Sequence, residues 1–294
     1  MRSFKMGAQS QAGRLRIDCH QGGGQAMRVG GVRGMNQRMR VLVTGAAGVI
    51  GRAVFRHLSD RYELHALTRR PADFPSHVAD IANLDAILPA FDGMDAVVHL
   101  AASVAVESPW EDVLRDNLIG AYNVFEASRR AGVGAVVFAS SNHTIGMYEV
   151  EAAPAIYALD DPRVFDHTVE VRPDSLYGVS KVYGEALGRY YHERFGIRVY
   201  NLRIGTVRAD DNPRDPSVAQ SSTWLNLTPE EKFLRLRATW LSQRDCAELI
   251  AACLEARHVG WAVVYGVSDN PRKFWDISHA RELLGWTPKD RAPL

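Results

Sequence analysis

The apolar positions along this chain alternate between short continuous runs and longer stretches with helical spacing. Short apolar runs typical of buried strands occur at four places: 41–44, 63–68, 96–100 and 135–139. Amphipathic stretches with helical spacing follow these runs: 49–54, 84–88, 110–130 and 175–195. Because strands that alternate with helices form parallel sheets with helices on both faces, this order predicts an α/β fold.

A glycine-rich turn joins the first predicted strand to the first predicted helix. Gly45, Gly48 and Gly51 have the spacing G-x-x-G-x-x-G, and Val49 and Ile50 begin the helix. Glycines allow a sharp bend here and let a pyrophosphate approach the backbone N–H groups at the helix N-terminus. The pattern predicts a dinucleotide site at these residues, and a glycine-rich turn without a ligand is the alternative.

The end of the second strand bears on which dinucleotide binds. In dinucleotide-binding folds an acid at this place accepts from the ribose 2′-hydroxyl of NAD, whereas arginine pairs with the 2′-phosphate of NADP. This chain has Thr68, Arg69 and Arg70 and no acid. The cofactor is therefore expected to be NADP or NAD with NADP favoured, although two solvated arginines would give the same sequence. Further along, Asp80 and Ile81 are expected near the adenine.

Two further strand ends carry residues suited to a binding cleft. The third strand ends in His99, which is expected to be packed, and Leu100, and the small residues Ala101 and Ala102 follow. Small residues let a flat ring approach the backbone, so this stretch is expected to line the dinucleotide cleft. Hydroxyl, amide and imidazole groups follow the fourth strand: Ser140, Ser141, Asn142 and His143. Ligands of open α/β sheets bind at this carboxyl edge, but the start of an ordinary polar loop explains the second group equally well.

A tyrosine and a lysine lie four residues apart in the long helical stretch 175–195. Tyr177 and Lys181 therefore share one helix face. A tyrosine of pKa about 10 is a poor base at neutral pH, and a nearby ammonium stabilises its phenolate. The preceding segment, 146–174, is acidic and proline-rich and reads as a loop with one helical turn, suited to covering a substrate.

Composition and charge exclude several classes of protein. The 294 residues are 46% hydrophobic and 23% charged, as in a globular protein. The three cysteines have no metal-ligand spacing and no disulfide pattern, so no metal site is expected, and a cytoplasmic location fits. No apolar run is long enough to span a membrane.

Residues 1–39 differ from the rest of the chain. Seven of them are Lys or Arg and one is acidic, so that without them the formal charge changes from +1 to −5. We expect residues 1–39 to form a disordered basic extension and residues 40–294 to form the folded domain. The acidic body gives no reason to expect nucleic-acid binding.

The glycine turn, the serine strand end and Tyr177-x-x-x-Lys181, in that order, resemble the extended short-chain dehydrogenase/reductase superfamily from Arg40 to about Pro288. The resemblance implies a Rossmann-like, doubly wound parallel sheet with a small C-terminal substrate lobe. It also implies that Ser141 is the catalytic hydroxyl, Tyr177 the base and Lys181 its support. Asn117 matches the helix asparagine that this superfamily typically has beside the cofactor.

Several motifs resemble uronate dehydrogenases and related aldose 1-dehydrogenases more closely: 138–146, 177–181, 202–205, 239–242 and 274–279. That resemblance implies that Ser141, Asn142 and His143 contact a sugar and that Arg235 anchors a uronate carboxylate. It also places Ile204 at the cofactor and Thr206 at the substrate. The segment between Thr206 and Trp240 is longer than in the uronate enzymes, so neutral pentoses and hexoses stay open as substrates.

The expected activity is NAD(P)-dependent oxidation of the anomeric C1 hydroxyl of a uronic acid or related aldose to the lactone. A nucleotide-sugar epimerase or dehydratase is one alternative, and a dinucleotide-sensing regulator without turnover is another. The expected partner is a small sugar, with no nucleic acid or membrane, and a homo-oligomer is compatible with these features.

Overall fold

The computed structural model describes residues 37–221 and 225–293. Nearly all of the predicted basic extension, residues 1–36, lies outside the described residues, so its predicted disorder stays a prediction. From Arg38 onward the chain forms one compact unit. Within the described ranges, no helix combines the length and the apolar character that crossing a bilayer requires.

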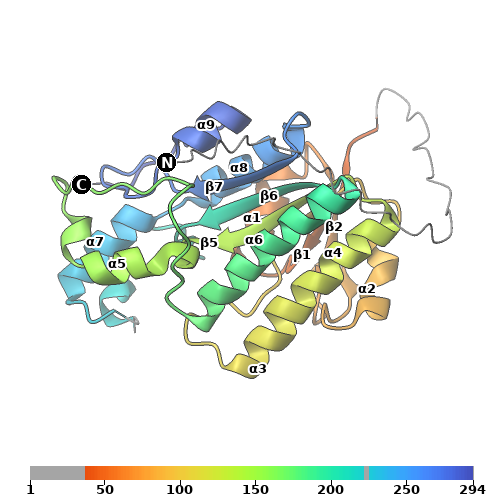
Figure 1. Ribbon diagram of the computed structural model, residues 1–294, viewed down its shortest axis with the longest axis horizontal. Coiled ribbons are helices and arrows are strands. Elements are labelled where there is room, and N and C mark those ends of the chain that lie inside the picture. Colours follow the sequence, from red (N-terminus) through yellow and green to blue (C-terminus); the bar gives the residue numbers. More distant parts are fainter. Residues whose placement is uncertain (1–36, 222–224, 294) are drawn as a thin grey trace, which may run out of the picture. The chain divides into compact units, whose positions relative to one another are not determined.

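Seven parallel strands form a single sheet in the order β3-β2-β1-β4-β5-β6-β7 (Figure 1). The strands are β1 (Arg40–Thr44), β2 (Glu63–Thr68), β3 (His77–Val78), β4 (Ala96–His99), β5 (Ala135–Ser141), β6 (Arg198–Ile204) and β7 (Trp261–Gly266). The chain runs outward from β1 to β3 and then returns to add β4 on the other side of β1. This reversal leaves a crevice at the carboxyl ends of β1 and β4, where ligands of doubly wound sheets bind.

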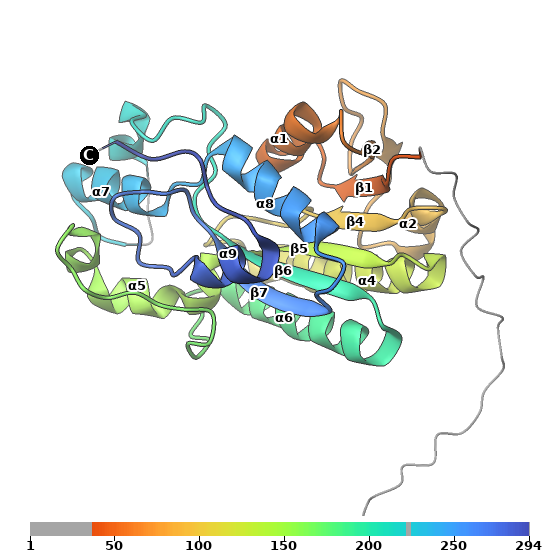
Figure 2. The ribbon, with the colours of Figure 1, turned by 90° about the horizontal axis from the view of Figure 1, so that it is seen from above.

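The longer helices form two layers around the sheet, with α1 and α8 on one face and α4 and α6 on the other (Figure 2). The described helices are α1 (Val49–Leu58), α2 (Leu84–Phe91), α3 (Trp110–Asp112), α4 (Gly120–Ala131), α5 (Gly146–Ala152), α6 (Leu176–Phe195), α7 (Pro229–Thr239), α8 (Gln243–Glu255) and α9 (Ser278–Leu284). The predicted parallel α/β architecture is therefore confirmed.

The predicted helix at 110–130 is continuous but not uniform. A π-helical segment, Val113–Ile119, joins α3 to α4. Such segments widen the helix and turn individual side chains to directions that a regular α-helix does not allow. Asn117 lies in this segment and is buried.

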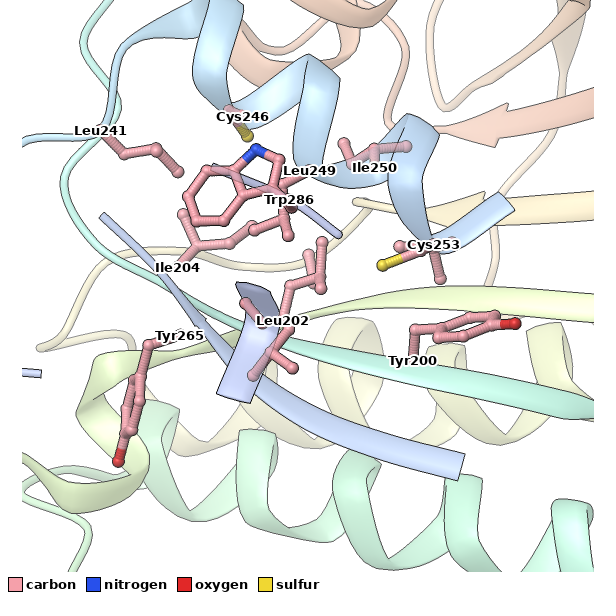
Figure 3. Packing of buried hydrophobic residues seen from close by; sticks show 14 of the residues in the cluster. Tyr200, Leu202, Ile204, Leu241, Cys246, Leu249, Ile250, Cys253, Tyr265 and Trp286 are labelled. Atoms are coloured by element: carbon pink, nitrogen blue, oxygen red, sulfur yellow. The ribbon is translucent and has the colours of Figure 1, made fainter. Parts of the chain in front are cut away.

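The core between α8 and the sheet is densely apolar. Side chains of α8 face side chains of β6, and Trp286 belongs to the same cluster (Figure 3). Cys246 and Cys253 lie in this core, and burial raises the pKa of the Cys246 thiol to about 12. Thiols buried in this way behave as small apolar side chains.

Two helices, α5 and α7, lie beyond the carboxyl ends of the strands in both views (Figures 1 and 2). The predicted loop 146–174 thus contains more helix than one turn, because α5 and a 3₁₀ turn, Ala155–Tyr157, both fall within it. On the C-terminal side, α7 contributes Leu236 to a small apolar cluster with Val218, Trp240 and Ala292. These elements form the wall above the strand ends.

Candidate active site

The glycine turn after β1 has the geometry that its sequence predicts. Gly45 has a φ of 69°, and a Cβ at this position would lie 2.8 Å from the backbone nitrogen of Ala101. A Cβ on Gly51 would lie 2.5 Å from the backbone oxygen of Ala46. Both contacts are closer than real Cβ atoms tolerate, so glycine is required for the turn to pack on β4 and on the start of α1.

A buried threonine and a buried histidine hold the ends of β1 and β4 together. Thr44 Oγ1 accepts hydrogen bonds from the backbone N–H groups of Leu100 and Ala101, each at 3.2 Å. Because Thr44 Oγ1 already accepts these two hydrogen bonds, its hydroxyl donates to His99 Nδ1, 2.8 Å away. Burial, with a smaller contribution from the Lys181 charge, lowers the pKa of His99 to about 3. His99 is therefore a neutral packed histidine, as its sequence context suggests.

A cavity of about 640 Å³ begins at this turn and extends along the carboxyl ends of the strands. Sixteen residues predicted from the sequence line it: Gly45, Gly48, Val49, Ile50, Gly51, Leu100, Ala101, Ala102, Ser141, Asn142, His143, Tyr177, Lys181, Ile204, Thr206 and Arg235. The sequence analysis did not single out Val104, Ala139, Gly205 and Val207, which also line it. The cavity is large enough to take a nicotinamide end together with a sugar.

A second cavity, of about 170 Å³, adjoins the first at Gly45, Ala101 and Ala102. It is lined in addition by Arg69, Ile81 and by residues the sequence analysis did not select: Leu67, Thr68, Ala79 and Asp116. Since it lies over the end of β2, it is the natural place for the adenosine half of a dinucleotide.

The charged residues around the second cavity are paired with one another. Arg69 Nη1 donates to Asp116 Oδ2 at 2.9 Å, and Arg115 Nη1 donates to Asp116 Oδ1 at 2.7 Å. Asp80 bonds to Arg115. Arg70 is exposed, and neither Arg70 nor Asp80 is part of the described lining of either cavity. Sequence reasoning missed Asp116 as a functional candidate, although Asp116 directly precedes Asn117, which the sequence analysis did select.

The N-terminus of α6 presents the tyrosine and the lysine to the large cavity. Ser175 caps the helix by accepting from the N–H of Gly178 at 3.0 Å, which fixes the first turn that carries Tyr177. Lys181 Nζ lies 5.4 Å from the Tyr177 ring centroid and donates to the backbone oxygen of Ala139 at 2.8 Å. The predicted pairing on one helix face is therefore present.

Burial dominates the ionisation of both groups. It raises the pKa of Tyr177 to about 12, while the hydrogen bond with Ser141 lowers it and the charge of Asp174 raises it. Burial also lowers the pKa of Lys181 to about 8. The ammonium that should favour the phenolate thus lies close to the ring, but in this structure the loss of water around the phenol outweighs it.

His143 lies between the serine and the tyrosine and has a buried acid behind it. Its Nδ1 is 2.7 Å from Asp174 Oδ2, and its ring meets the Tyr177 ring edge-on at 5.7 Å. Asp174 also accepts a hydrogen bond from Ser175 Oγ. Sequence reasoning missed Asp174, whose signal is an acid directly before Ser175, the N-cap of the helix that carries Tyr177 and Lys181. This partner fixes the orientation of His143 in the cavity.

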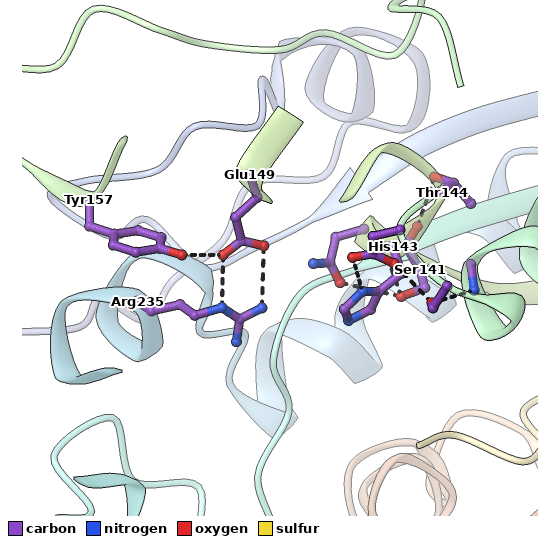
Figure 4. A network of polar contacts seen from close by, with 10 residues as sticks. Ser141, His143, Thr144, Glu149, Tyr157 and Arg235 are labelled. Atoms are coloured by element: carbon purple, nitrogen blue, oxygen red, sulfur yellow. Dashed lines mark hydrogen bonds and ion pairs between the residues drawn. The ribbon is translucent and has the colours of Figure 1, made fainter. Parts of the chain in front are cut away.

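Arg235 reaches the cavity from α7 and is already held by an acid on α5. Its Nε donates to Glu149 Oε1 at 2.8 Å and its Nη2 to Glu149 Oε2 at 3.3 Å (Figure 4). The Tyr157 hydroxyl donates to the same carboxylate at 2.8 Å. Burial alone would lower the pKa of Arg235, but the charge and hydrogen bonds of Glu149 raise it.

Asn117 does not appear in the described lining of either cavity and instead joins two other elements. Its side-chain oxygen accepts from the N–H of Ser103 at 2.7 Å, and its amide nitrogen donates to Ser180 Oγ at 2.9 Å. Ser180 lies on α6 between Tyr177 and Lys181 and donates to the Tyr177 backbone oxygen. Asn117 thus positions the helix that carries both groups.

The fold and the site define an enzyme of the Rossmann type with a serine, a tyrosine and a lysine beside a dinucleotide cleft. The family model described as "NAD dependent epimerase/dehydratase family" matches residues 41–261, and the chain belongs to this family.

Named relatives cover most of the chain. An NAD-dependent glucose-6-phosphate dehydrogenase from Haloferax volcanii is 39% identical, over 86% of this chain and 94% of its own. An L-arabinose 1-dehydrogenase (NAD(P)(+)) from the same organism is 36% identical, over 86% and 97%. The crystal structure of a mutant uronate dehydrogenase from Agrobacterium tumefaciens complexed with NAD superposes with a TM-score of 0.70 at 36% identity, covering 87% of this chain and 86% of that one.

Proposed function

We propose that this protein oxidises the C1 hydroxyl of a cyclic sugar to the lactone, with a nicotinamide dinucleotide as the hydride acceptor. One observation carries the proposal: Ser141, Tyr177 and Lys181 line the same cavity as the glycine turn. The names of the relatives support a sugar as the substrate class.

The residues around the cleft fit a dinucleotide. Gly45, Gly48 and Gly51 line the large cavity, and Gly48 is the N-cap of α1, so the N-terminus of this helix lies at the cavity. Gly48 and the range 100–102 would hold the pyrophosphate and nicotinamide parts, and Ile204 would pack on the ring. When bound, the nicotinamide supplies the acceptor for the hydride.

The protein's own groups handle the proton of the reaction. Tyr177, as phenolate, accepts the proton of the C1 hydroxyl, while the bond pair of C1–H leaves as hydride and the C1–O double bond forms. Ser141 donates a hydrogen bond to the same oxygen, and the Lys181 ammonium stabilises the phenolate. His143, fixed by Asp174, holds a neighbouring sugar hydroxyl. The presence of Ser141, His143, Tyr177 and Lys181 in the lining of one cavity supports these roles.

For the cofactor, we propose that both NADP and NAD are accepted, with NADP favoured by Arg69 and Arg70. Because Arg69 is bonded to Asp116, a 2′-phosphate has to compete with that carboxylate for the guanidinium. This competition reduces the discrimination that two arginines would otherwise give.

A panel of neutral aldoses, uronates and uridine diphosphate sugars, each with NAD and with NADP, tests the proposal. We expect reduced nicotinamide to form with free sugars and the lactone to be trapped as its hydroxamate. Turnover of nucleotide sugars alone, or conversion of a sugar without net cofactor reduction, would instead indicate an epimerase or dehydratase.

A further inference from the structure

Arg235 lines the large cavity, and its guanidinium is already paired with Glu149. The Arg235 side chain is 13% exposed and the Glu149 side chain 3%, so the pair is almost dry. Two nitrogens of the guanidinium face two oxygens of the carboxylate. This is the bidentate arrangement that a substrate carboxylate would itself need.

The Glu149 carboxylate is held in place beside Arg235 by a second partner. It lies on α5, and the hydroxyl of the fully buried Tyr157 holds one of its oxygens. Moving it away would leave either its own charge or the tyrosine hydroxyl without a partner inside the protein, which is costly. A second carboxylate brought to Arg235 would also lie within a few ångströms of the first, in surroundings that screen like charges poorly.

Lys181 and His143, which also line the described part of the cavity, do not offer an anion site. Lys181 is bound to the Ala139 backbone oxygen beside Tyr177, and His143 faces the buried Asp174. Each of these side chains therefore already has an internal carbonyl or acid in contact with it.

We propose that Glu149 is a specificity-determining residue: it neutralises Arg235 and so makes this subsite take the uncharged, hydroxyl-bearing end of a neutral aldose. The inference rests on the proposed function and names its substrate class. A sugar hydroxyl can accept from the guanidinium without adding a negative charge, whereas a carboxylate or phosphate ester brings a second negative charge close to Glu149.

The first test uses the unaltered protein and sugars that differ only at C6. The kcat/KM for galactose is compared with that for galacturonate, and the value for glucose with those for glucuronate and glucose 6-phosphate. We expect each neutral sugar to be preferred at least about tenfold, the factor that corresponds to about 1.4 kcal/mol. A smaller preference, or a preference for either anion, overturns the inference.

The second test releases the arginine. In Glu149→Gln the carboxylate charge is gone, and we expect the ratio of galacturonate to galactose efficiency to rise at least about tenfold. Glu151→Gln is the matched control, because Glu151 lies on the same helix but pairs with Arg172 at the surface. A smaller rise in Glu149→Gln, or an equal rise in the control, counts against the inference.

A binding measurement separates this inference from the proposed function. If neither the neutral nor the acidic sugars are oxidised, the proposed function fails, and the subsite is judged from thermal unfolding with reduced cofactor and galacturonate. We expect galacturonate to raise the Tm of Glu149→Gln and to leave the Tm of the parent protein unchanged. A rise for the parent, or none for the variant, overturns the inference even if no turnover is seen.

Discussion

Lys181 Nζ donates a hydrogen bond to the backbone oxygen of Ala139, 2.8 Å away, on the strand next to the catalytic helix. The contact fixes the ammonium near the Tyr177 ring, and among the residues that the structure describes no carboxylate is paired with it. Burial disfavours the charged form of Lys181 and lowers its pKa to about 8. The hydrogen bond to the Ala139 carbonyl favours the charged form and opposes this effect.

Replacing Lys181 with Met should stabilise the protein at pH 7 while abolishing most activity. The ordinary lysine pKa of 10.5 falls to about 8 on folding, which corresponds to about 3 kcal/mol of unfavourable free energy for the charged form. The lost hydrogen bond offsets about 1 kcal/mol of the gain. Urea unfolding should show a net gain of about 2 kcal/mol at pH 7.

The sign of the pH dependence provides the control for this prediction. Between pH 8 and 10.5 the unfolded chain binds a proton at Lys181 that the folded chain has lost, so this group makes the parent protein more stable as the pH rises. The advantage of Lys181→Met should therefore disappear by about pH 10. An advantage that is equal at pH 7 and pH 10 would show that the cause is not the buried charge.

Replacing Tyr177 with Phe should remove the base and leave the cleft intact. Turnover is expected to fall by on the order of 10² to 10⁴, the usual contribution of a positioned general base. Binding of reduced cofactor, followed by its fluorescence, should change little. Tyr183→Phe, on the same helix but partly buried against the core cluster that contains α4 side chains, is the control and should keep its turnover. Near-normal activity of Tyr177→Phe would refute the assignment.

His99 should make the protein sensitive to acid. The pKa of His99 is about 3 in the folded protein and ordinarily 6.5. Below pH 6.5 the imidazole therefore binds a proton in the unfolded chain but not in the folded protein. The stability present above pH 6.5 is lost as the pH falls toward 3, and the loss at pH 5 should be about 2 kcal/mol. In His99→Gln this part of the loss should be absent, whereas the exposed His258→Gln should behave as the parent in urea unfolding.

The pairing of Arg69 with Asp116 predicts opposite effects of two substitutions on cofactor choice. Arg69→Ala should lower the ratio of NADP to NAD efficiency by about tenfold, since one charge-assisted contact is lost. Asp116→Asn should raise the ratio, because the guanidinium is released toward the 2′-phosphate. Asp112→Asn, on the exposed side of the preceding turn, should leave it unchanged. Steady-state kinetics with both cofactors measure this ratio in each variant. A change of the ratio in the same direction in all three variants would disprove the assigned role of Arg69.

The sequence was sufficient to place the residues at strand ends. Gly45 and Ser141 belong to local patterns whose position in a doubly wound sheet follows from the order of elements along the chain, and Tyr177 is placed by the start of α6, a helix that follows β5. The same holds for Leu100 and its neighbours, and the parallel topology brings all of them to one cavity.

Partners that come from distant segments could not be predicted in this way. Glu149 and Arg235 are 86 positions apart, and their contact depends on how α5 and α7 pack beyond the sheet. The same is true of Arg69 and Asp116, separated by 47 positions. Arg235, predicted from the sequence to anchor a carboxylate, does line the cavity. Glu149, the acid that is paired with Arg235, has no local sequence pattern that predicts this contact.

The π-helical segment 113–119 makes the catalytic helix depend on the number of residues in another helix. A regular α-helix turns by about 100° per residue, so removing one residue there and rewinding the segment would rotate Asn117 away from Ser103 and Ser180. A one-residue deletion in this helix is therefore expected to lower the activity, because it changes the direction in which Asn117 points, although the deletion is remote in sequence from Tyr177. The number of residues in this segment therefore determines whether Asn117 can hold Ser180 on α6.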